Sequence, residues 1–168
     1  MSNKVDELKA EVLKAQQDSD VASLYVLEQR AHDTFNEETL QAFYANILDI
    51  ALERLTDTLE AAKVMDMNEV QDFATLRALY EYAIEHYSAG AIADASALFE
   101  VLSGLSNDHK FSTALKFHWI ASKENITLED FIDKIADIDA TQNAGTFYMS
   151  CFKNEAQKLL DDSKSESK

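Results

Sequence analysis

Residues 76–109, LRALYEYAIEHYSAGAIADASALFEVLSGLSNDH, decide the fold of this chain. Their length matches the 34-residue period of a tetratricopeptide repeat, which is a pair of antiparallel helices. Leu79 stands at the first large apolar position and Ala83 follows four residues later; Ala95 and Phe99 come at the spacing of the second helix. We expect the two alanines to let the helices cross closely, while the larger side chains fill the space beside them.

Helical spacing continues on the C-terminal side of this stretch. Residues 112–139 have the length of a second helix pair, and Thr127 with Asp130 predicts the start of a helix over 127–139. Residues 143–160 fit the first helix of a third unit. The alternative is a helical bundle that matches the repeat once by chance.

The chain before the repeats is also predicted to be helical. We expect a long helix over 36–63 and an amphipathic helix over 3–17, whose narrow apolar stripe suits pairing with a second copy. The predicted organisation is an N-terminal helical region at 1–70, a tetratricopeptide-like array at 71–160 and a disordered polar tail at 161–168. The candidate dimerisation residues are Val5, Leu8, Val12 and Ala15.

The scarcity of turn-forming residues supports the same fold class. The 168 residues include no proline and only three glycines, whereas sheets need many tight turns rich in these residues. Gly90 is the glycine that we expect to end a helix of the first repeat. The sequence therefore predicts an all-α protein of helical hairpins.

The charge of the chain excludes several kinds of partner. The formal net charge is −16, and residues 31–109 contain only three basic side chains against 15 carboxylates. Such a field repels phosphate backbones and anionic membrane surfaces, so we expect no nucleic-acid binding. We also expect no membrane insertion, because no apolar run approaches the ~18 residues that a span requires. With one cysteine and no apolar leader, a cytoplasmic location is predicted.

Residues for catalysis or metal binding do not gather in the sequence. The four histidines are scattered, no glycine-rich phosphate loop exists, and no Glu-x-x-His pair of a di-iron bundle occurs. Cys151 lies on an apolar stripe without a nearby histidine, which favours a structural thiol. We predict a protein that is not an enzyme and that uses no cofactor and no metal.

The segment 79–102, LYEYAIEHYSAGAIADASALFEVL, resembles the first repeat of the translocator chaperones of bacterial type III secretion. The likeness continues more faintly beyond it and covers about half of the chain. It is carried by Leu79, Tyr80, Ala83, Tyr87, Ser88, Gly90, Asp94, Ala95, Phe99 and Leu102, then by Asp108, Phe111, Phe147 and Cys151.

This resemblance implies a small, acidic, cytoplasmic and commonly dimeric chaperone. Such a protein keeps a hydrophobic secreted subunit soluble by holding an extended segment of it in a concave groove. The inner faces of the first helices would line that groove, where apolar pockets and tyrosine rings supply contact area. The predicted partner-binding residues are Tyr80, Ile84, Tyr87, Lys116, Ile120, Lys123 and Phe152.

Two other functions are compatible with the sequence. The acidic stretch at 31–109 would suit a regulatory protein that mimics nucleic acid and occupies a basic site. The stripe on residues 3–17 would suit a structural protein that associates with itself.

Overall fold

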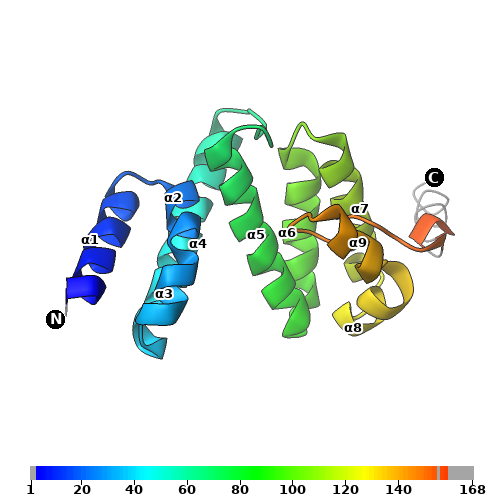
Figure 1. Ribbon diagram of the computed structural model, residues 1–168. Helices are drawn as coiled ribbons and strands as arrows, with labels where there is room; N and C mark the ends of the chain where they lie inside the picture. The colour runs from blue at the N-terminus through cyan, green and yellow to red at the C-terminus, as the bar shows by residue number, and fades with distance from the viewer. Residues whose placement is uncertain (1–2, 155, 159–168) are drawn as a thin grey trace. The chain divides into compact units, whose positions relative to one another are not determined.

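The computed structural model describes residues 3–154 and 156–158, and the regular structure in this part of the chain is helical (Figure 1). The prediction of an all-α fold is confirmed. The helices are α1 (Asn3–Gln17), α2 (Val21–Val26), α3 (Glu28–Thr34), α4 (Glu37–Glu60), α5 (Val70–Ser88), α6 (Ile92–Leu105), α7 (His109–Lys123), α8 (Leu128–Asp130), the π-helical turn η1 (Phe131–Ile135) and α9 (Ile138–Ala144).

The chain divides into two compact units, and the boundary between Ala78 and Leu79 falls within α5. The sequence places this boundary eight residues earlier. Among the described residues, none of the helices combines the length and the apolar character that a membrane span requires.

The N-terminal unit packs α1 against α2, α3 and α4. The side chain of Asp20 caps α2 by accepting a hydrogen bond from the amide of Ser23 at 3.0 Å. Arg54 of α4 donates to the hydroxyl of Thr75 at 3.0 Å, and this bond joins α4 to the first part of α5.

The dimerisation stripe predicted on α1 lies largely inside this unit. Leu8, Val12 and Ala15 are buried, and Val5 is half-buried. These side chains therefore cover the unit's own core, so the stripe offers little free apolar area to a second copy.

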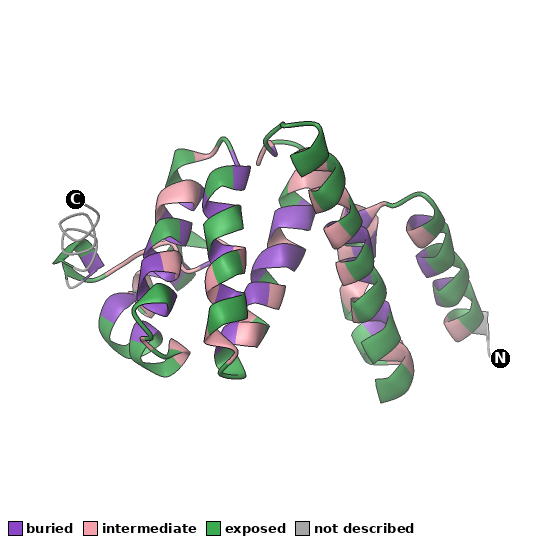
Figure 2. Cartoon of the chain, turned by 180° about the vertical axis from the view of Figure 1, so that it is seen from behind, coloured by how far each residue is buried: buried purple, intermediate pink, exposed green. Residues whose placement is uncertain are grey.

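The C-terminal unit is built on the helices that the opening stretch predicts. Leu79, Ala83, Ala95 and Phe99 are all fully buried, as expected for residues between crossing helices. Helix α6 packs against α7, and each of them carries buried residues on one side and exposed residues on the other (Figure 2). The tetratricopeptide repeat itself stays a prediction.

The prediction of one helix over 127–139 is wrong. Thr127 caps a helix as expected, with its hydroxyl 3.2 Å from the amide of Asp130, but the chain changes to π-helical spacing at Phe131. Ala136 is extended, with φ −78° and ψ 144°, and α9 begins two residues later. The cause is a pairing that the local sequence does not contain: the Lys153 amide donates to the Ile135 carbonyl at 2.8 Å.

The prediction of a helix over 143–160 is also wrong. Helix α9 ends at Ala144, where Gly145 adopts φ 71°, a left-handed conformation that glycine tolerates without strain. Residues 146–153 are not helical, and α9 is followed by a connection that runs back across the unit (Figure 1). We call residues 146–153 the covering segment. The tail predicted to be disordered, 161–168, lies outside the described residues.

Candidate functional site

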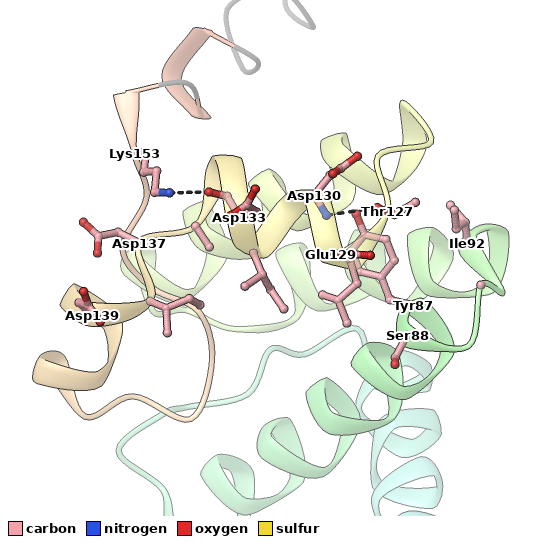
Figure 3. Close-up of a pocket in the computed structure, with 15 residues that line it drawn as sticks. Tyr87, Ser88, Ile92, Thr127, Glu129, Asp130, Asp133, Asp137, Asp139 and Lys153 are labelled. Atoms are coloured by element: carbon pink, nitrogen blue, oxygen red, sulfur yellow. Dashed lines mark hydrogen bonds between the residues drawn. The ribbon is translucent and has the colours of Figure 1, made fainter.

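A groove of about 930 Å³ opens on the surface of the C-terminal unit. Its walls come from the end of α5, the start of α6, α8 with η1, and the start of α9 (Figure 3). The apolar part of its lining consists of Tyr87, Ile92, Leu128, Ile132, Ala136 and Ile138. A surface groove of this size is large enough to hold several side chains of a partner.

Local backbone features give the groove its form. Gly90, at φ 84°, turns the chain between α5 and α6. The π-helical turn and the extended Ala136 then separate α8 from α9, so that side chains from both sides face one hollow. Asp137 caps α9 by accepting from the amide of Ala140 at 3.0 Å.

The polar part of the lining is strongly acidic. Five carboxylates contribute to it, and the one basic side chain in the lining is Lys153. The Lys153 ammonium group donates to the main-chain carbonyl of Asp133 (Figure 3). The carboxylates belong to Glu129, Asp130, Asp133, Asp137 and Asp139.

A buried polar chain lies elsewhere in the same unit, around Tyr80. The Nδ1 atom of His118 is 2.7 Å from the carbonyl oxygen of Ala114, which can only accept, so Nδ1 carries the proton. The Nε2 atom of a neutral His118 then accepts from the Tyr80 hydroxyl at 2.8 Å, and that hydroxyl oxygen accepts from the Met149 amide at 3.1 Å. Each polar atom in this row of hydrogen bonds between Ala114, His118, Tyr80 and Met149 thus has a partner.

Burial sets the protonation states of His118 and Tyr80. Desolvation lowers the pKa of His118 from 6.5 to about 4, so its imidazole is neutral at physiological pH. Burial also raises the pKa of Tyr80 above its ordinary value of 10. A neutral imidazole and a protonated phenol are the forms that the hydrogen bonds require.

The covering segment closes this part of the unit from solvent. Its Phe147 and Tyr148 rings lie 6.0 and 6.3 Å from the Tyr80 ring, and Tyr148 meets Phe111 edge-on at 5.0 Å. Its backbone is held as well, because the amides of Ser150 and Cys151 donate to the Thr141 hydroxyl at 3.3 and 3.1 Å. A non-helical segment with aromatic side chains therefore occupies the face where we expect a partner.

The predicted partner-binding residues fall into two groups. Tyr80, Tyr87 and Ile120 are buried, and Phe152 is half-buried with its ring 4.6 Å from that of Phe117. Tyr87 is the only predicted residue among those that line the groove. The others, Ile84, Lys116 and Lys123, are half-buried or exposed and lie outside the lining.

The lining residues between 129 and 139 were missed by the sequence reasoning. The signal was present, because this stretch of eleven residues, EDFIDKIADID, contains five carboxylates and three isoleucines. The single helix predicted over 127–139 would spread these side chains around a cylinder. The break at Ala136 instead brings the five carboxylates and two of the isoleucines, Ile132 and Ile138, to one hollow, while Ile135 is buried outside the lining.

No protein-family model, curated protein or solved structure matches this chain. Within residues 3–154 and 156–158, no group of three or more histidine, cysteine or acidic side chains is arranged to hold a metal ion. The site is thus defined by its groove, apolar on one part of the lining and acidic on the other.

Proposed function

We propose that this protein is a chaperone of the type III secretion kind, which binds a segment of a hydrophobic secreted subunit and keeps that subunit soluble. The observation that carries the proposal is the groove, because its lining combines partly exposed apolar side chains with charge and includes Tyr87, a residue predicted at the partner. Binding of this kind needs contact area and solubility rather than catalytic groups.

The covering segment adds a second kind of support. Its aromatic rings and the Met149 amide contact Tyr80, so the surroundings of Tyr80 are able to hold a non-helical segment. We place the partner in the open groove rather than at Tyr80, because the chain itself fills the latter position. A cytoplasmic location and a homodimer belong to the same proposal.

The test is co-expression with candidate hydrophobic translocator subunits. We expect a subunit that is insoluble alone to appear in the soluble fraction and to co-purify with this protein. Light scattering then gives the mass of the complex. If every candidate stays insoluble and the protein runs alone, the chaperone proposal is wrong.

A matched pair of variants locates the binding site. Ile132 lines the groove and is 39% exposed, whereas Val101 on α6 is 36% exposed and lies outside the lining. We expect Ile132→Ser to lower the yield of the soluble complex and Val101→Ser to leave it unchanged. Equal yields of the soluble complex from both variants would show that the partner does not bind in the groove.

The predicted dimer has its own test. Because most of the α1 stripe is buried in its own unit, a dimer through this stripe requires α1 to exchange or detach. Removal of residues 1–17 would then abolish the dimer. An unchanged mass in light scattering would exclude this route to association.

A further inference from the structure

The groove presents two kinds of surface to whatever occupies it. On the apolar part of the groove, the side chain of Ile132 is exposed, although large aliphatic side chains gain free energy by leaving water. Its neighbours in the lining, Ile92, Leu128 and Ile138, are each half-buried. An occupant that inserts one or two apolar side chains would complete their burial.

The carboxylates of the lining are incompletely neutralised within the described part of the chain. Asp130 has an ion pair with Lys134, at 3.8 Å and on exposed side chains, and such a pair contributes little. Glu129, Asp133 and Asp139 have no ion pair among the described residues. Bringing so many negative charges to one hollow costs free energy that a cationic occupant would recover.

Lys153 provides an example of the required contact. Its aliphatic stem reaches the groove and its ammonium group is hydrogen-bonded to the main chain of Asp133, beside the acidic side chains (Figure 3). The lining therefore accommodates a lysine at one end. Further lysine or arginine side chains along the groove would meet Glu129, Asp130 and Asp139.

We propose that the groove binds a basic amphipathic segment of a partner protein, in which lysine or arginine side chains flank one or two large apolar ones. This inference rests on the proposed function for the idea that a protein segment is the ligand, and it adds the chemistry of that segment. Nucleic acid does not fit, because the lining repels phosphate. A second copy fits poorly, since each chain has a formal net charge of −16.

Three synthetic peptides test the inference on the full-length protein. The first has lysines beside two leucines and carries a fluorescent label; the second replaces the lysines by glutamates; the third replaces the leucines by serines. Fluorescence polarisation should show saturable binding of the first peptide, weakened by added salt, and binding at least about tenfold weaker for the other two. Equal binding of the glutamate peptide, or of the serine peptide, overturns the inference.

Charge-matched variants place the peptide. We expect the triple variant Glu129→Gln, Asp133→Asn, Asp139→Asn to weaken binding of the lysine–leucine peptide by about tenfold. The control variant Glu85→Gln, Asp94→Asn, Glu100→Gln removes three exposed carboxylates of the same unit that do not line the groove, and it should change binding by less than about twofold. Equal losses in the two variants would reduce the effect to net charge and overturn the inference.

Circular dichroism of both triple variants verifies that they fold, which is expected because all six side chains are exposed or at the surface. The outcome is separable from that of the proposed function. If the peptide binds in the groove while no secreted subunit is kept soluble, the chaperone proposal fails and the groove's preference stands. If a subunit is kept soluble while the peptides fail these tests, the chaperone proposal stands and the proposed preference of the groove for a basic amphipathic segment is wrong.

Discussion

Tyr80 and Tyr87 stand about two helical turns apart on α5, yet the chain completes their surroundings in different ways. Tyr80 is covered by residues that arrive from far along the sequence, through Phe147, Tyr148 and Met149. Tyr87 is covered by Phe99 of α6 and Phe131 of η1, and its hydroxyl donates to the carbonyl of Ile126 in the connection after α7; the open groove begins beside it. We call these two positions the closed end and the open end of the unit.

The difference shows what each end can contribute. Side chains at the closed end stabilise the fold, so substitutions there should act on the free energy of unfolding. Side chains such as Ile132 at the open end are partly exposed, so substitutions there should act more on binding than on the free energy of unfolding. The predictions below test this division in order of decreasing effect.

The largest effect is expected from Tyr80→Ala. Tyr80 is 4% exposed, and its removal leaves a cavity and two unsatisfied hydrogen-bonding groups, so we expect a loss of about 3–5 kcal/mol in the free energy of unfolding. Urea titration followed by the fluorescence of Trp119, the single tryptophan, reports on this unit. Tyr82→Ala, on the same helix but at a half-buried ring, is the control and should cost within about 1 kcal/mol. Comparable losses would show that the closed end is not special.

The second effect is a dependence of the free energy of unfolding on pH, caused by the titration of His118. Its pKa is about 4 in the folded chain and 6.5 when exposed, so below pH 6.5 the unfolded chain binds a proton that the folded chain does not. Stability is therefore present in full near pH 7 and falls as the pH decreases toward 4, by about 3 kcal/mol in total. Carboxylates titrate in the same range, so His118→Gln is compared over the same pH values. If both proteins lose stability equally, the neutral imidazole is not responsible.

A smaller effect is expected where the backbone of the covering segment is attached. Thr141→Val keeps the shape of the side chain but removes the oxygen that accepts from two amides, which should cost about 1–2 kcal/mol. Local opening would then expose Cys151, the one cysteine, and raise its rate of alkylation by up to about tenfold. Thr113→Val on α7 is the matched control. An unchanged alkylation rate in Thr141→Val would show that the segment is held by its rings alone.

The smallest effect on stability is expected at the open end. Ile132→Ser should lower the free energy of unfolding by about 1 kcal/mol or less, because the side chain is already 39% exposed. The same variant is the one expected to weaken partner binding. A large loss of stability in urea titration would erase the distinction between the two ends.

The sequence predicts the helices well as far as Lys123 and poorly beyond. Ala83, Ala95 and Phe99 have the spacing expected of a helix pair, so their burial could be expected. Phe147, Tyr148 and Phe152 are compatible with a helix in the local pattern, and their non-helical conformation depends on partners such as Tyr80 and Ile135 far earlier in the chain. Local periodicity contains no information about such pairings.

The candidate site could be predicted only in part for the same reason. Tyr87 was identified because it lies on a regular helix. Asp133 and Ile132 belong to a turn whose π-helical form is fixed by the strand-like bridge between Ala136 and Phe152. The groove therefore depends on a tertiary contact, although all the residues that give it charge are visible in the sequence.

The covering segment also has a consequence for the order of events during synthesis. The amide of Met149 meets the hydroxyl of Tyr80 across 69 residues of chain, so α5, α6 and α7 leave the ribosome well before the rings that shield them. Until residue 153 has emerged, the aromatic surface around His118 is exposed in the nascent chain, where it can attract other apolar surfaces. During translation, this protein therefore has its own exposed apolar surface that needs protection from aggregation.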